Sequence, residues 1–156
     1  LGGILLTAST NSGDSIGTRS VKSSVGQLMV LGGAAGGFAG PDDLDIALDD
    51  TQLREIGLTL GSGVVMVHDQ HVDFLDQLRR IAAFFRDESC GQCVPCRVGT
   101  IRQEEAIERL SAGSNETDLA LLRDIAEAMR DASICGLGQT AANAVQSAVV
   151  RLGALS

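Results

Sequence analysis

The sequence predicts an α+β protein in which a glycine-rich half containing short strands precedes a half made of amphipathic helices. In residues 1–69, short apolar runs alternate with glycine clusters, which is typical of strands and turns. From residue 72 onward, apolar residues recur at intervals of three and four, which is the period of a helix with one buried face. We therefore expect two small domains, over residues 1–69 and 70–156.

The first half offers two strand candidates, at residues 25–31 and 64–68. The polar stretch 11–24 is expected to be a loop, and the glycine run 32–37 a turn. A short helix is expected over residues 51–56, with Asp50 as its N-cap.

Four helices are expected in the second half. The first follows residue 72 and places Phe74, Leu78 and Phe85 on one face. The others are expected over residues 99–110, over residues 117–132 with Ser114 or Asn115 as cap, and from Thr140 as N-cap. Four helices joined by short loops imply a small bundle.

Four cysteines follow a pattern that indicates an iron-sulfur cluster. Cys90, Cys93 and Cys96 are spaced C-x2-C-x2-C, and Cys135 follows after 38 further residues. A cubane cluster needs four thiolates that converge from different directions, and a tight loop plus one remote cysteine meets that need. We therefore predict a [4Fe-4S] cluster held by these four cysteines.

Three neighbours of the cysteines are expected to surround this cluster. Gly91 lets the backbone turn closely around inorganic sulfide, while Pro95 fixes its own φ and removes one backbone donor. Arg97 follows the third cysteine and can supply positive charge that favours reduction of an anionic cluster. An ordinary solvated arginine is the alternative interpretation of Arg97.

Other uses of four cysteines remain as alternatives. A structural zinc site usually pairs two C-x2-C knuckles, whereas this chain has a triple and a single. A zinc-stabilised interaction domain without redox activity is the main alternative function. Two disulfides are disfavoured in the reducing compartment that we expect, and an inert buried thiol is the alternative for Cys135 alone.

The charge balance bears on partners and location. The chain has 12 basic and 20 acidic residues, and its net charge of -8 would repel nucleic acids and anionic lipids. No apolar run approaches the roughly 20 residues of a membrane span, and residues 1–9 lack the positive flank of a signal peptide. We expect a cytoplasmic protein that neither binds nucleic acid nor inserts into a membrane.

Two cysteine-bearing segments resemble a known family. Residues 88–100 (ESCGQCVPCRVGT) and 135–140 (CGLGQT) are similar to the C-terminal part of the flavoprotein subunit of NADH:quinone oxidoreductase, or complex I. Related subunits occur in NAD-dependent formate dehydrogenases and NAD-reducing hydrogenases. The resemblance implies a four-helix bundle carrying the [4Fe-4S] cluster over residues 70–156. Upstream, residues 32–38 (GGAAGGF) and 60–67 (LGSGVVMV) look like parts of that family's small β-grasp domain of the soluble-ligand-binding type. The resemblance therefore implies such a domain over residues 1–69, which we expect to be incomplete at its start.

The resemblance further implies what must lie elsewhere. Flavin and NADH bind in a larger preceding domain of that family, and its glycine-rich flavin loop does not occur in this sequence. We therefore assign no catalytic residue and expect FMN and NAD only in a missing domain or partner. The implied role is to relay electrons from reduced flavin to another iron-sulfur centre, as part of an NADH dehydrogenase-like oxidoreductase.

The same resemblance implies three partners. These are a flavin-bearing domain or subunit, a thioredoxin-like [2Fe-2S] subunit and another iron-sulfur subunit. Any membrane association would come through such a larger complex.

Overall fold

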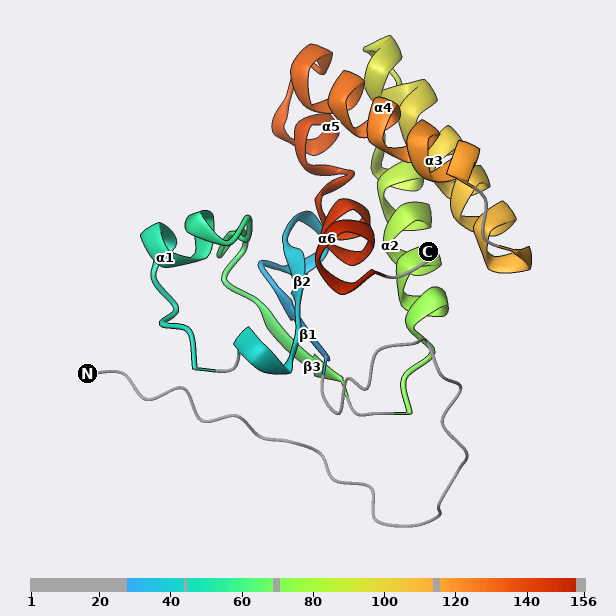
Figure 1. Ribbon diagram of the computed structural model, residues 1–156. Helices are drawn as coiled ribbons and strands as arrows, with labels where there is room; N and C mark the ends of the chain where they lie inside the picture. The colour runs from blue at the N-terminus through green and yellow to red at the C-terminus, as the bar shows by residue number, and fades with distance from the viewer. Residues whose placement is uncertain (1–27, 44, 69–70, 114–115, 154–156) are drawn as a thin grey trace.

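The computed structural model describes residues 28–43, 45–68, 71–113 and 116–153, and its fold is α+β as predicted (Figure 1). Three short strands form one sheet, and the remaining elements are helices. The elements are β1 (Leu28–Leu31), η1 (Gly33–Ala35), β2 (Gly37–Ala39), η2 (Pro41–Asp43), α1 (Asp50–Glu55), β3 (Val65–His68), α2 (Phe74–Glu88), α3 (Val94–Ala112), α4 (Glu116–Ala132), α5 (Gly136–Thr140) and α6 (Asn143–Leu152).

The sheet has the order β2-β1-β3, with β1 antiparallel to both neighbours. Strands β1 and β3 fall within the two predicted segments, whereas β2 was not predicted. Strand β2 has only three residues, and its stability comes from distant partners. Phe38 pairs with Val30 across the sheet, and its backbone N–H donates to the Ser147 hydroxyl of α6 at 2.8 Å. Helix α6 therefore covers the outer edge of β2, whose unpaired backbone groups could otherwise bind another strand.

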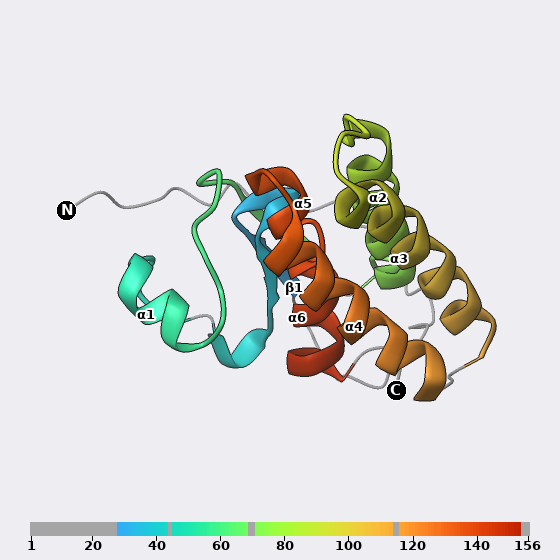
Figure 2. The same ribbon diagram turned by 90° about the horizontal axis from the view of Figure 1, so that it is seen from above.

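Both faces of the central strand β1 are covered. Leu28, Val30 and Phe38 point into the core shared with the helices, while Met29 and Leu31 belong to a smaller cluster around α1. Two perpendicular views show α1 and α2 on opposite sides of the sheet (Figures 1 and 2). Because alternate side chains of a strand point to opposite faces, all four residues of β1 are buried.

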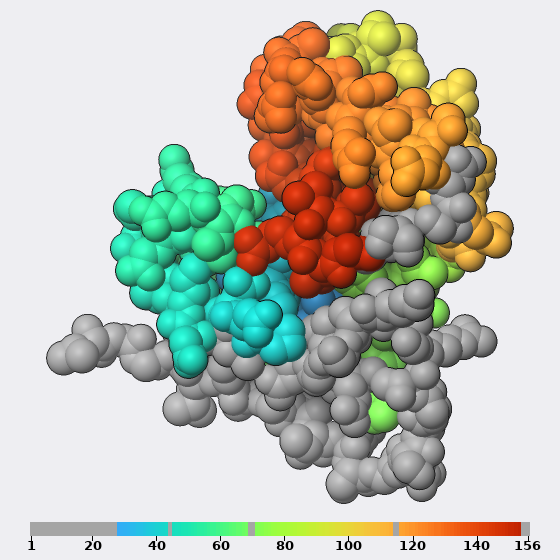
Figure 3. Space-filling view, in the orientation of Figure 1, coloured from blue at the N-terminus to red at the C-terminus, as the bar shows by residue number. Residues whose placement is uncertain are grey.

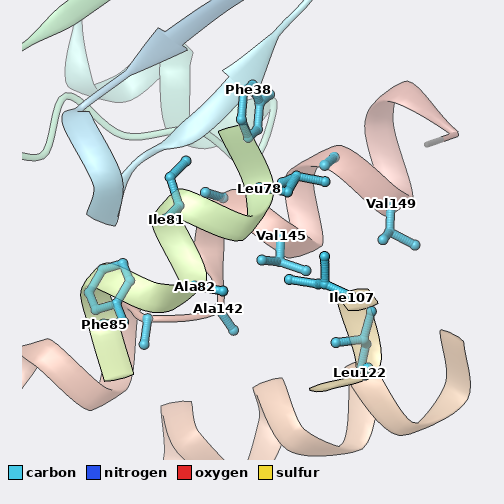
Figure 4. Packing of buried hydrophobic residues seen from close by; sticks show 14 of the residues in the cluster. Phe38, Leu78, Ile81, Ala82, Phe85, Ile107, Leu122, Ala142, Val145 and Val149 are labelled. Carbon is cyan, nitrogen blue, oxygen red and sulfur yellow. The ribbon is translucent and has the colours of Figure 1, made fainter. Parts of the chain in front are cut away.

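The main core joins the sheet to the helices (Figure 4). Helices α2, α3, α4 and α6 all contribute side chains, among them Leu78, Ile107, Leu122 and Val145, each at most 1% exposed. Helix α6, red in Figure 3, lies at the surface between the α1 segment and α4. Its inner face therefore connects the sheet with the rest of the helices.

The starts of helices α1 and α3 differ from those predicted. Asp49, rather than Asp50, caps α1, because the Asp49 carboxylate accepts from the Thr51 backbone N–H at 2.8 Å. Helix α3 begins at Val94, five residues before the predicted start. Pro95 lies in its first turn, where a missing N–H costs nothing and the fixed φ favours the helix.

The predicted fourth helix corresponds to α6, and a short helix that was not predicted, α5, precedes it. Thr140 is not an N-cap but the last residue of α5, and its hydroxyl donates to the Gly136 carbonyl at 2.8 Å. Helix α6 starts at Asn143, after Ala142. The predicted cap at Ser114 or Asn115 lies outside the described residues. Within the described ranges, no helix is long and apolar enough to cross a membrane.

Candidate metal centre

The four cysteines line one hollow of about 140 Å³. Cys90 and Cys93 come from the turn that joins α2 to α3, Cys96 comes from the first turn of α3, and Cys135 precedes α5. The structure therefore brings all four predicted ligand residues to a common space, although Cys135 is distant in sequence.

The cysteine loop has local reasons for its shape. Gly91 has φ 75°, in the left-handed region that glycine adopts without strain. Cys93 occupies the N-cap of α3, so Cys96 already lies in the first turn of that helix. The Arg97 guanidinium donates to the Gly91 carbonyl at 3.3 Å, which keeps this side chain close to the loop. Gly91, Pro95 and Arg97 thus all lie in or beside the cysteine loop.

Two side-chain amides hold the remote segment, one within the segment and one from α3. Gln139 donates to the Ser133 carbonyl at 3.1 Å, which closes the turn around Cys135. The buried Gln103 of α3 donates to the Ala141 carbonyl, also at 3.1 Å. These two bonds fix the segment that carries the fourth cysteine.

A close backbone contact completes the site at Gly138. A Cβ atom at this position would lie 2.4 Å from the Ser133 hydroxyl oxygen and 2.8 Å from the Cys96 Cβ. Both distances are far below van der Waals contact, so α5 can approach the cysteines only with glycine here.

The environment favours the thiolate form of Cys93. The pKa of Cys93 is lowered, chiefly because the backbone N–H of Ile134 donates to its sulfur. The backbone N–H of Cys96 acts in the same direction. Because a metal ligand must be deprotonated, this arrangement prepares Cys93 for metal binding.

Cys96 is in the opposite situation. Its pKa is raised, first by burial and then by repulsion from the neighbouring thiolates of Cys93, Cys135 and Cys90, while the Ser89 hydroxyl opposes the rise. Four thiolates in one hollow repel one another unless cations lie between them. The donor set therefore suits a soft, positively charged metal group.

The four cysteines differ in exposure. Cys96 is 5% exposed and Cys93 is half-buried, whereas Cys90 and Cys135 are exposed. The hollow thus has a sheltered side, formed by α3, and an open side.

The spacing of the sulfurs bears on the kind of metal. In the described ranges, no group of three or more His, Cys, Asp or Glu side chains is arranged to hold a single metal ion. A zinc ion with Zn–S bonds of about 2.3 Å needs sulfurs within about 4 Å of one another. A cubane cluster attaches each thiolate to a different iron, so its four ligand sulfurs lie farther apart than those of a single ion.

Sequence reasoning did not identify Ser89, Ser133, Gly138 and Gln139, which the structure places around the cysteines. Their positions in the sequence, close to the cysteines, give a weak indication of this role. Ser89 directly precedes Cys90, Ser133 lies two residues before Cys135, and a Gly-Leu-Gly run follows Cys135.

The fold and the hollow define a helical module that gathers four cysteines at one site. Residues 76–152 match the family model of the NADH-ubiquinone oxidoreductase-F iron-sulfur binding region. The match confirms the family resemblance and, at the level of the family, the expected [4Fe-4S] cofactor.

Curated relatives agree with this assignment. HndC, a subunit of the NADP-reducing hydrogenase of Solidesulfovibrio fructosivorans, is 36% identical over 117 residues, which cover 74% of this chain and 24% of HndC. An NADH-quinone oxidoreductase subunit of Rhizobium meliloti is 36% identical over 106 residues, which cover 67% of this chain and 24% of that subunit. The chain thus spans about a quarter of the length of these relatives.

A solved structure shares the fold. The NAD+-reducing [NiFe]-hydrogenase in its H2-reduced state matches with a TM-score of 0.67 and 33% identity, over 80% of this chain and 21% of that chain.

Proposed function

We propose that this chain is an electron-transfer module in which Cys90, Cys93, Cys96 and Cys135 hold one [4Fe-4S] cluster. The observation that carries the proposal is the common hollow lined by these four cysteines. It lies within the region that matches the iron-sulfur family. When bound, the cluster accepts and releases electrons one at a time.

The protein's own residues then provide position and environment. Cys96 and the first turn of α3 hold the sheltered side and exclude water, while Cys90 and Cys135 form the open side that faces an electron donor or acceptor. Arg97 supplies positive charge near the loop, and Gly91 and Pro95 shape the backbone around it.

The rest of the proposal concerns the larger protein. We take residues 1–69 as part of a β-grasp domain and residues 70–156 as the helical bundle. FMN and NAD would bind in a flavin-bearing domain or subunit, and electrons would pass on to a thioredoxin-like [2Fe-2S] subunit or another iron-sulfur subunit. Support comes from relatives named as subunits of NADH-quinone oxidoreductase and NADP-reducing hydrogenase. Such a complex would provide any link to a membrane.

Anaerobic purification of the chain tests the cluster. We expect a brown protein with about four iron and four sulfide per chain. A colourless protein with one zinc would contradict the proposal and favour the zinc-stabilised interaction domain.

The remote ligand is tested by Cys135→Ser, which should leave a labile, partly occupied or three-iron cluster. The matched control is Ile134→Ala, since this neighbouring side chain is 77% exposed and contributes only its backbone N–H to the site. A stable four-iron spectrum in Cys135→Ser would remove Cys135 from the ligand set.

Turnover tests where the electrons originate. The isolated chain with NADH and an artificial acceptor should show no turnover, because we place the flavin and NADH sites elsewhere. Rapid turnover without a partner would refute that placement.

A further inference from the structure

Two serine hydroxyls flank the cysteines and have no role in the function described so far. The Ser89 hydroxyl lies 3.3 Å from the Cys96 sulfur, at the C-cap of α2. A thiolate has no proton to give, so in a metal-bound site the hydroxyl must be the donor.

The buried hydroxyl of Ser133 is the more informative of the two. The residue is 6% exposed, and its hydroxyl oxygen is buried without a hydrogen-bond partner among the described residues. Buried hydroxyls without partners are unfavourable and rare, so this one calls for a hydrogen-bond acceptor close beside it. Gly138 indicates on which side that acceptor lies. The Ser133 hydroxyl and the Cys96 side chain both lie close to the point where a Gly138 Cβ atom would be.

The position of Ser133 is fixed from several directions. Its backbone N–H donates to the Met129 carbonyl at 3.2 Å, at the end of α4. Its carbonyl accepts from Gln139 at 3.1 Å. The hydroxyl therefore sits on a held backbone beside the cysteines, rather than on a free loop.

We propose that Ser89 and Ser133 are positioning residues that donate hydrogen bonds to the sulfur atoms of the bound cluster and thereby raise its reduction potential. The inference rests on the proposed function, because it requires a cluster in the hollow. Hydrogen bonds to sulfur are among the features that set the potential of an iron-sulfur cluster. The reduced cluster carries more negative charge than the oxidised one, so a donor stabilises the reduced form more.

The test is a redox titration of the cluster-loaded full chain, followed by electron paramagnetic resonance. At the midpoint potential of the parent protein, Ser89→Ala and Ser133→Ala should each lower the ratio of reduced to oxidised cluster by about tenfold, or about 59 mV for one electron. Ser89→Thr keeps the hydroxyl at a half-buried position and should retain the parent potential.

The matched control is Ser147→Ala. Ser147 is also a buried serine, 7% exposed, but its hydroxyl serves Phe38 and Ala144 in the sheet region. We expect this variant to lose stability and to keep the parent potential, which separates a local effect on sulfur from a general effect of removing a buried hydroxyl.

Iron and sulfide content is measured first, so that the two proposals fail separately. A parent chain without about four iron would refute the proposed function. A parent chain with the cluster, together with alanine variants that titrate at the parent potential, would overturn the role of the serines and leave the function standing. An equal shift in Ser147→Ala would also overturn it. If Ser133→Ala does not retain the cluster, Ser89→Ala and Ser89→Thr decide the question.

Discussion

The core around Phe38 and the hollow around Cys96 are joined by one helix but are built differently. At the start of α2, Phe74 packs edge-on against Phe38 with ring centroids 4.9 Å apart, and at its end Glu88 lines the cysteine hollow. The core is stabilised by apolar packing, an interaction that has no preferred direction. The hollow is shaped by directed hydrogen bonds, a close backbone contact and cysteines that are partly open to solvent.

The difference implies that stability and cofactor binding can be damaged separately. Truncation of any apolar side chain in the core should lower the free energy of unfolding. Small changes around the hollow should disturb metal binding more than folding. The following variants test this separation.

The largest expected effect is that of Phe38→Ala. Phe38 is fully buried between the sheet and α2, so its truncation should cost about 3–5 kcal/mol in the free energy of unfolding. Denaturant unfolding followed by circular dichroism measures the change. Phe84→Ala is the matched control, because Phe84 is 47% exposed on the same helix as Phe74 and should cost far less. Equal losses in the two variants would refute the assigned core.

A smaller effect on folding, with a larger one on the metal site, is expected for Gly138→Ala. The added methyl group would collide with Ser133 and Cys96, and overpacking of this kind costs about 1–3 kcal/mol. Iron content after anaerobic reconstitution should fall clearly below that of the parent.

Gly136→Ala provides the control for this variant. Gly136 belongs to the same short helix, but a Cβ there would meet nothing within 4 Å. Iron content should be unchanged. Normal iron content in Gly138→Ala would show that α5 does not shape the hollow.

The smallest effect is expected for Thr100→Val. The buried Thr100 hydroxyl donates to the Cys96 carbonyl at 2.9 Å, and valine keeps the shape while removing that bond. Loss of one such bond costs about 0.5–1.5 kcal/mol. Denaturant unfolding should detect the change while iron content stays at the parent value. Complete loss of iron would instead make this bond essential to the ligand geometry.

Features with local causes could be predicted from the sequence. Helix α2 was predicted because its apolar period lies within one segment, and the cysteine set because its spacing is itself the signal. Asp49 and Asp50 show the limit of such reasoning, since either carboxylate could cap α1 and only the backbone geometry chooses.

Features that depend on distant contacts could not be predicted. Strand β2 is held through a hydrogen bond between Phe38 and Ser147, which are 109 positions apart. The position of the Ser133 hydroxyl beside the cysteines likewise depends on how the Cys135 segment folds back over the loop. In the sequence, Ser133 is a polar residue before a turn like many others.

The order of the cysteines along the chain has a consequence for biosynthesis. At a synthesis rate of about 5–20 residues per second, Cys135 leaves the ribosome about 2–8 s after Cys96. During that interval the nascent chain presents three thiols without the fourth, and α3 and α4 have yet to pack. Delivery of a complete cluster by the cell's assembly machinery must therefore wait for translation to pass α4, and metal captured earlier would occupy a three-thiol site.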